Sequence, residues 1–200
     1  MPVTRGFFRK RPDGPEGRLP PGQYDTGAGW PVLTAEATPR LDTADWTMTV
    51  DGLVESPTTW TWDEIHALPG STFTGDIHCV TTWSKFDTVF SGVSVDELLE
   101  AARPRADARF VMARSTTGYT TNLPLEDVRG GRAWVAYEYD DEPLHPEHGG
   151  PARLLVPHLY FWKSAKWIRA LVLQKRDDPG FWEQNGYHLH GDPWTEERYW

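Results

Sequence analysis

The sequence contains one cysteine, Cys79, in surroundings that are suited to binding a ligand. Free cysteine is most often a small buried hydrophobic residue, so the residue type alone decides nothing. Here an apparent strand ends at Cys79, and the polar stretch from Thr81 to Lys85 follows it as a loop whose donors can meet a ligand. One soft thiolate is a poor structural zinc site but a good anchor for a metal whose other ligands come from a cofactor. The residues around Cys79 therefore predict a cofactor or metal site.

A second group of candidate residues is basic and lies in the segment LLVPHLYFWKSAKW and just before it. Arg153, Lys163 and Lys166 can hold a phosphate if they lie on a loop next to exposed backbone N–H groups, because Arg offers a bidentate fork and Lys a point charge. A solvated basic loop is the common alternative. Taken alone, this cluster is a weak indication of an anion site.

Two histidine pairs offer a different metal site. His145 and His148 are three positions apart, and His188 and His190 are two apart, spacings that let two imidazoles bind one ion. Neither pair has an adjacent Glu in an H-E-x-x-H arrangement or a second cysteine nearby. A zinc hydrolase built on these histidines remains a minor alternative.

Composition and charge restrict the partners that the protein can have. The net charge of −9 disfavours a nucleic-acid binder, which needs a basic footprint. No stretch approaches the length of an apolar membrane span, and the first residues lack the apolar run of a secretory signal. A single cysteine cannot form an internal disulfide, which fits a reducing compartment. We expect a cytoplasmic location, with the periplasm as the alternative if an export signal was removed.

The elements that position these residues belong to one domain, because 200 residues leave little length for a second. Residues 1–45 are rich in Pro, Gly and Thr and predict an extended arm, whose basic start reads as a solvated tail. We expect the folded domain to span 46–200. The basic residues of the tail are Arg5, Arg9, Lys10, Arg11 and Arg18.

Short helices and several strands are expected within the domain. Thr61 with Glu64, and Ser94 with Glu97, have the spacing of a capping box at a helix start. Strand-like runs separated by irregular loops predict a mostly β, α+β domain. These runs are WTMTVDGLV at 46–54, FTGDIHCV around Cys79, ARFVMARS before Thr116, AWVAYEY before Asp140, ARLLVP at 152–157 and KWIRALVLQ at 166–174.

Four motifs in a fixed order carry a family resemblance: IHCVTTWS around Cys79, GYTTNLPLEDV at 118–128, VAYEYDDEPLHPEHGGPARLLVP at 135–157 and WKSAKWIRALVLQ at 162–174. With them the sequence resembles the molybdopterin-binding domain of the sulfite oxidase family, which includes methionine sulfoxide reductase catalytic subunits. The resemblance covers nearly the whole chain from about Pro20. It implies a sulfite oxidase-type α+β fold and a molybdopterin cofactor, a molybdenum pyranopterin with one dithiolene.

The resemblance also implies roles for single residues. Cys79 would supply the protein thiolate to molybdenum, whose other ligands come from the dithiolene and from oxygen. Tyr119 looks like the active-site tyrosine of sulfite oxidases, and Trp83 and Lys85 would help to orient the substrate. The remaining cofactor contacts that the resemblance implies are Ser115, His148, Arg153, Ser164, Ala165 and Lys166.

The expected activity is a two-electron oxygen-atom transfer on a small substrate, which is sulfite-like or sulfoxide-like. The stretch after Cys79 carries only Lys85 as a charge, where sulfite oxidases carry an arginine. The C-V-x-x-W-S form is closer to the sulfoxide reductase branch, whereas the region 135–174 is closer to sulfite oxidase. No C-x-x-C-H haem motif is present, so electrons are expected to pass to or from a separate partner, a cytochrome, a quinone-linked protein or a soluble carrier. A non-catalytic molybdopterin carrier is the alternative.

Overall fold

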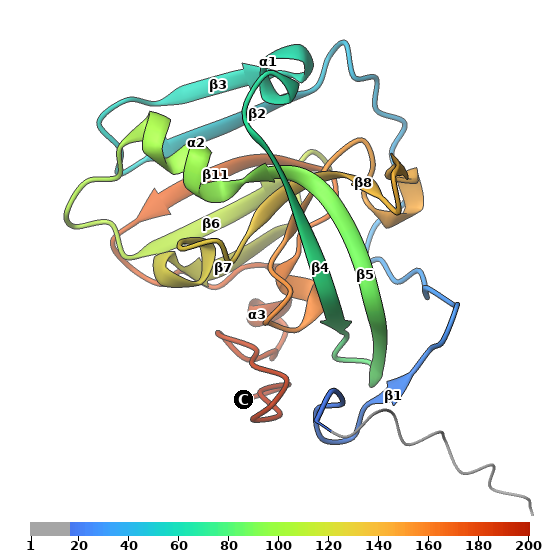
Figure 1. The fold of residues 1–200 in the computed structure, drawn as a ribbon. Helices are drawn as coiled ribbons and strands as arrows, with labels where there is room; N and C mark the ends of the chain where they lie inside the picture. Colours follow the sequence, from blue (N-terminus) through green and yellow to red (C-terminus); the bar gives the residue numbers. More distant parts are fainter. Residues whose placement is uncertain (1–16) are drawn as a thin grey trace, which may run out of the picture.

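The structure is a computed structural model that describes residues 17–200 (Figure 1). Four of the five basic tail residues lie outside the described residues. The fifth, Arg18, forms an ion pair with Asp76 and a second one with Asp87. Of the described residues, no helix is both long and apolar enough to cross a membrane.

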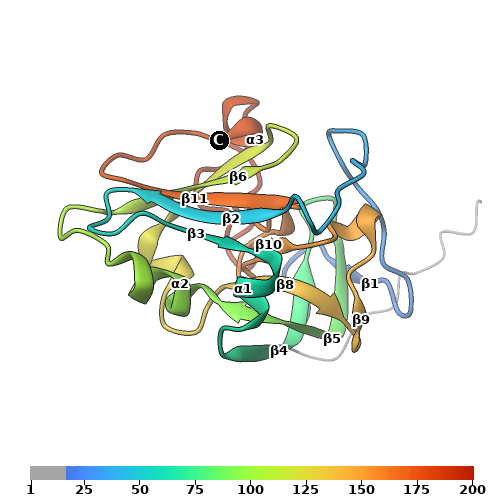
Figure 2. The same cartoon turned by 90° about the horizontal axis from the view of Figure 1, so that it is seen from above.

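One sheet has five strands in the order β3-β2-β11-β6-β7. Strand β11 lies at its centre, parallel to β2 and antiparallel to β6. Viewed from above, the sheet lies with α1, α2 and the long strands β4 and β5 on one side (Figure 2). The strands span β2 Thr47–Gly52, β3 Thr58–Thr61, β6 Phe110–Ser115, β7 Thr120–Pro124 and β11 Ile168–Gln174.

The other sheet has six strands and is centred on β5, which pairs with β1, β4 and β8. Only the pairing of β1 with β5 is parallel, and it attaches the arm to the domain. Strands β9 and β10 both pair with β8. The strands span β1 Tyr24–Asp25, β4 Gly70–His78, β5 Trp83–Ser94, β8 Trp134–Tyr139, β9 Glu142–Pro143 and β10 Arg153–Leu155.

The helices are short, and two of them start where the capping residues predict. Thr61 caps α1, Trp62–His66, with the complete capping box to Glu64. Ser94 caps α2, Val95–Ala102, by accepting a hydrogen bond from Asp96 N. The remaining helical turns are η1 Leu125–Val128, η2 Pro146–His148, η3 Phe161–Lys163 and α3 Phe181–Gln184.

Two apolar clusters hold the layers together. The larger lies between the sheets and under α2, whose Leu98 and Leu99 are buried against strand residues such as Val111 and Leu171. The smaller is aromatic and surrounds Cys79, with Trp83, Phe90 and Trp162 among its members. Apolar area removed from water contributes about 25 cal/mol per Å², so both clusters stabilise the fold. The aromatic cluster also makes the walls of the site.

The mostly β, α+β architecture confirms the expected fold class, and all six predicted strand runs contain a strand. The expected loop from Thr81 to Lys85 is wrong, because β5 already begins at Trp83 and runs for 12 residues. Only a tight turn separates it from β4. Trp83 and Lys85 therefore lie in a strand, where hydrogen bonds with β1 and β4 fix the backbone.

Candidate functional site

A tight turn between β4 and β5 positions Cys79. The Cys79 N–H donates to the carbonyl of Trp83 at 2.8 Å, and Thr82 N–H donates to the carbonyl of Cys79 at 3.0 Å. Thr82 has a φ of 75°, which lets the chain reverse over so few residues. The His78 ring makes a buried 2.7 Å hydrogen bond with Ser84 Oγ. The backbone of the cysteine is thus fixed by the hydrogen bonds of the turn that joins β4 to β5.

Cys79 lies on the wall of a cavity of about 290 Å³, whose lining includes many aromatic side chains. The cavity brings together nine of the ten residues expected from the sequence: Cys79, Trp83, Ser115, Tyr119, His148, Arg153, Ser164, Ala165 and Lys166. Further wall residues come from the arm, from η3 and from the C-terminal segment, including Trp30, Glu36, Phe161, Trp162, Trp182 and Tyr187.

The Cys79 side chain is nearly buried, with 7% of its surface exposed. Burial raises the pKa of its thiol, while the hydroxyl and N–H of Thr81 act in the opposite direction. The Thr81 Oγ1 lies 3.2 Å from Cys79 Sγ. Since a coordinated metal ion deprotonates a thiol outright, a cation bound here would convert Cys79 to the thiolate.

Arg153 lies in the cavity wall as a buried cation without a carboxylate partner among the described residues. Its side chain donates to the carbonyls of His148 and Ser164, each at 2.7 Å, and its guanidinium lies 4.0 Å over the ring of Phe161. Burial lowers its pKa to about 9, so it stays charged at neutral pH. A buried charge is costly unless it is paired, so this geometry favours a bound anion.

Lys166 provides a second cation in the same wall. Its ammonium donates to the carbonyl of Glu147 at 2.6 Å, and burial, with the charge of Arg153 as the next cause, lowers its pKa to about 8. Gly149 lets the two basic residues come together: a Cβ there would lie 3.0 Å from Arg153 Cβ and 3.1 Å from Lys166 Cα. With a φ of 110°, that position favours glycine for its backbone as well.

Trp30, to which the sequence motifs assigned no role, also lines the cavity. Its indole stacks on the imidazole of His148 with ring centroids 3.7 Å apart and an interplanar angle of 8°. Burial lowers the pKa of His148 to about 4, and the charges of Arg153 and Lys166 contribute to this shift, so the ring is neutral at pH 7. The arm thereby supplies an aromatic wall beside the two cations.

Three further expected residues use part of their hydrogen-bonding capacity within the protein. The Tyr119 hydroxyl donates to the carbonyl of Trp162 at 2.7 Å, and burial raises its pKa well above the usual value, so it is a neutral phenol. Ser115 Oγ donates to the carbonyl of Lys166, and Ser164 Oγ accepts from Val156 N–H. Their remaining lone pairs are available to a bound group.

Lys85 is not part of the cavity wall. Its ammonium lies 3.4 Å from the carbonyls of Gly27 and Ala28, because the arm continues past the start of β5 after pairing with it. The side chain is 8% exposed. Lys85 is therefore not among the residues that could orient a substrate in this cavity.

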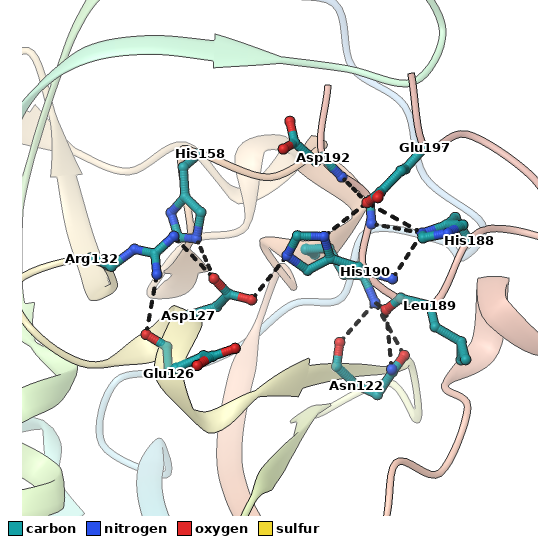
Figure 3. A network of polar contacts seen from close by, with 12 residues as sticks. Asn122, Glu126, Asp127, Arg132, His158, His188, Leu189, His190, Asp192 and Glu197 are labelled. Carbon is teal, nitrogen blue, oxygen red and sulfur yellow. Dashed lines mark hydrogen bonds and ion pairs between the residues drawn. The ribbon is translucent and has the colours of Figure 1, made fainter. Parts of the chain in front are cut away.

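The two histidine pairs make other contacts, and those of His188 and His190 are drawn in Figure 3. His190 bonds to Asp127 through Nε2 at 3.1 Å and to Glu197 through Nδ1 at 2.8 Å, while His188 lies 3.4 Å from Glu197. His145 and His148 have ring centroids 6.3 Å apart. Within residues 17–200 no group of three or more His, Cys, Asp or Glu side chains is arranged to hold a metal ion. The geometry thus gives the zinc alternative no support.

Comparison with protein families matches residues 35–182 to the oxidoreductase molybdopterin binding domain. The chain belongs to this family. Its cofactor is therefore molybdopterin, and the expected resemblance is confirmed. The observed site fits that group, because the cavity offers a soft thiol and two cations that lack carboxylate partners among the described residues.

Relatives agree with this assignment. The chain is 43% identical over 194 residues to the uncharacterized oxidoreductase YuiH of Bacillus subtilis (strain 168), covering 96% of this chain and 98% of YuiH. It is 30% identical over 152 residues to the putative protein-methionine-sulfoxide reductase subunit YedZ1 of Azospira oryzae, covering 76% of this chain and 58% of that protein.

The fold recurs in a solved structure. The sulfane dehydrogenase SoxCD from Paracoccus pantotrophus superposes with a TM-score of 0.66 at 22% identity, covering 74% of this chain and 42% of that one. At this identity the likeness establishes the fold alone. The protein is thus an oxidoreductase of the molybdopterin family with a sulfite oxidase-like fold.

Proposed function

We propose that the protein is a molybdenum-pyranopterin oxidoreductase that transfers one oxygen atom to or from a small substrate, with Cys79 as the protein ligand of molybdenum. The observation that carries this proposal is the cavity in which the single thiol shares walls with Arg153 and Lys166. The bound cofactor supplies the two-electron chemistry. The protein residues hold the cofactor, orient the substrate and exclude water.

In this proposal the cationic end of the cavity holds the anionic part of the cofactor. Arg153 and Lys166 neutralise a phosphate, and the uncharged ring of His148, fixed by Trp30, offers a hydrogen bond without adding charge. The hydroxyls of Ser115 and Ser164 and the backbone at Ala165 complete the polar contacts, which are drawn from three separate segments of the chain.

The substrate end is better suited to a neutral sulfoxide than to the sulfite dianion. Trp83, Trp182 and Tyr187 belong to or pack against the apolar cluster that contains Cys79, and Tyr119 and the carboxylate of Glu36 also line the cavity. Aromatic faces bind apolar substituents, while a carboxylate repels an anion. Tyr119 would orient the substrate as a neutral hydrogen-bonding group. The reaction would take up two electrons and two protons and release a sulfide and one water.

Electrons would come from a separate partner, a cytochrome, a quinone-linked protein or a soluble carrier, because the sequence has no haem-attachment motif. We further propose a reducing compartment, the cytoplasm, since a protein with a single cysteine gains nothing from an oxidising one.

The test is a comparison of the wild-type protein with Cys79→Ser. The wild type should contain molybdenum and pterin and reduce dialkyl sulfoxides with an artificial reduced electron donor, with a higher kcat/KM than it shows for sulfite oxidation. Cys79→Ser should keep its melting temperature and lose turnover by at least a hundredfold. Full molybdenum-dependent turnover in Cys79→Ser would refute the ligand assignment. Bound pterin without turnover of either substrate would instead indicate a carrier.

A further inference from the structure

Thr81 lies in the turn that joins β4 to β5 and contains Cys79. The turn is held by the hydrogen bonds of Cys79 N–H to Trp83 and of Thr82 N–H to Cys79, so the backbone around Thr81 is fixed. Thr81 Oγ1 lies 3.2 Å from Cys79 Sγ. A β-branched side chain has few χ1 rotamers, so the hydroxyl is held near the sulfur at little entropic cost. The protein's own backbone therefore fixes Thr81 Oγ1 beside Cys79 Sγ.

The hydroxyl of Thr81 has no other assigned use. Across residues 17–200 it is the only side-chain hydroxyl that lies within hydrogen-bond distance of the sulfur, and the sulfur is its only partner. Other threonine hydroxyls near the site donate to main-chain carbonyls: Thr26 to Gly29 and Ser84, and Thr116 to Trp167. Nor does Thr81 support the core, since its side chain is exposed to solvent. Its hydroxyl is therefore available to donate a hydrogen bond to Cys79 Sγ.

The direction of this hydrogen bond follows from the state of the sulfur. A thiolate that binds a metal has no proton, so only the threonine can donate. A hydrogen bond to a ligand sulfur withdraws charge from it and reduces its donation to the metal, a known way in which proteins set the reduction potentials of sulfur-ligated metals. Weaker donation favours the more reduced metal.

We propose that Thr81 is a positioning residue that donates a hydrogen bond to the Cys79 thiolate and raises the reduction potential of the metal centre. The inference rests on the proposed function, in which Cys79 is the metal ligand. Thr81 itself lines the cavity, and the role assigned to it here acts through the ligand sulfur. A higher potential favours electron uptake before oxygen-atom transfer to a sulfoxide.

The test compares Thr81→Val, which has nearly the same shape but no hydroxyl, with Thr81→Ser, which keeps the hydroxyl. The measurement is a redox titration of the molybdenum-loaded protein, followed by the electron paramagnetic resonance signal of Mo(V). Thr81→Val should shift the equilibrium towards the oxidised metal by about tenfold, or about 30 mV to more negative potential for a two-electron couple. Thr81→Ser should stay within experimental error of the wild type.

The control is Thr72→Val, the same substitution on β4, where the hydroxyl bonds to Ser91 and lies away from the cavity. It should leave the potential unchanged. An unchanged potential in Thr81→Val overturns the inference. A different variant tests the proposed function itself. If Cys79→Ser has the same Mo(V) spectrum as the wild type, the sulfur does not bind the metal and the proposed function fails. Because Thr81 is exposed, all the threonine variants should melt at the wild-type temperature, which excludes an effect through folding.

Discussion

Two buried cations, Lys163 and Arg153, lie close together in the sequence and have different partners. Lys163 Nζ is 2.7 Å from Glu183 Oε1 and also donates to Asn122, so its charge is neutralised within the protein. Arg153 donates to main-chain carbonyls and lines the cavity. Both side chains are removed from water. The difference separates a cation that holds the fold together from one whose counterion must come from a bound molecule.

The largest effect is expected for Lys163→Met. This change leaves the Glu183 carboxylate buried without its cation, and breaking a buried pair costs about 3–5 kcal/mol. Urea denaturation of the cofactor-free protein should record that loss of unfolding free energy. Adding Glu183→Gln to the same chain should recover part of it, since the amide can still accept from Thr121 and Trp162. A loss of unfolding free energy below about 1 kcal/mol would contradict the claim that the pairing of Lys163 with Glu183 stabilises the fold.

Arg153→Met should act on binding rather than on folding. Bound molybdenum and pterin should fall at least tenfold, because the cavity loses its buried countercharge. In the cofactor-free protein the unfolding free energy should drop less than in Lys163→Met, since no carboxylate among the described residues is left unpaired. Elemental analysis and pterin fluorescence after denaturation measure the first effect, and urea denaturation the second. Wild-type cofactor content in Arg153→Met would contradict the site.

Among the paired charges, His190 should give a pH-dependent stability. Its hydrogen bond with Asp127, then that with Glu197, raises its pKa to about 9, above the unfolded value of about 6.5. The stabilisation is therefore complete below pH 6.5 and disappears as pH rises through 9. The loss should stay near or below 1 kcal/mol, because 37% of the side chain is exposed. Subtracting the urea midpoints of His190→Gln from those of the wild type between pH 6 and 10 isolates this contribution. A difference that does not change with pH would show that His190 is not charged there.

The smallest effect is expected for Arg132→Met. Arg132 pairs with Asp127 at 3.0 Å, but 46% of its side chain is exposed, and exposed pairs contribute about 0–1 kcal/mol. Asp127 also keeps the hydrogen bonds of His158 and His190. Thermal unfolding should shift by no more than a few degrees. A loss as large as that in Lys163→Met would mean that pairing, and not burial, decides the effect.

Local signals in the sequence predicted the parts of the fold that depend on neighbouring residues. Thr61 with Glu64 marks the start of α1 because a capping box lies within one turn. Alternation with β-branched residues predicted β2, and strand-like runs predicted β6 and β11. The family motifs, rather than spacing, brought Cys79 together with Arg153, which is 74 residues away in the sequence.

The remaining parts depend on contacts that no local pattern encodes. Trp30 stacks on His148 because the arm crosses the domain, and its path is set by the pairing of β1 with β5. Because the arm follows this path, the Lys85 ammonium lies next to the carbonyls of Gly27 and Ala28. Ser84 and Lys85 read as a polar loop, although both are buried in β5. An aromatic stretch such as FWKSAKW gives no sign of which rings line a cavity and which fill the core.

Two segments far apart in the sequence contribute to the cavity wall, one from Trp30 to Glu36 and the other with Trp182 and Tyr187. A molecule that fills the cavity therefore bridges segments about 150 positions apart. By mass action, such a ligand stabilises the native chain by RT ln(1 + [L]/Kd) and ties the ordering of both segments to its own occupancy. Loading and protection of these two segments from proteolysis are then one equilibrium, in which retention of the pterin and integrity of the two segments rise and fall together.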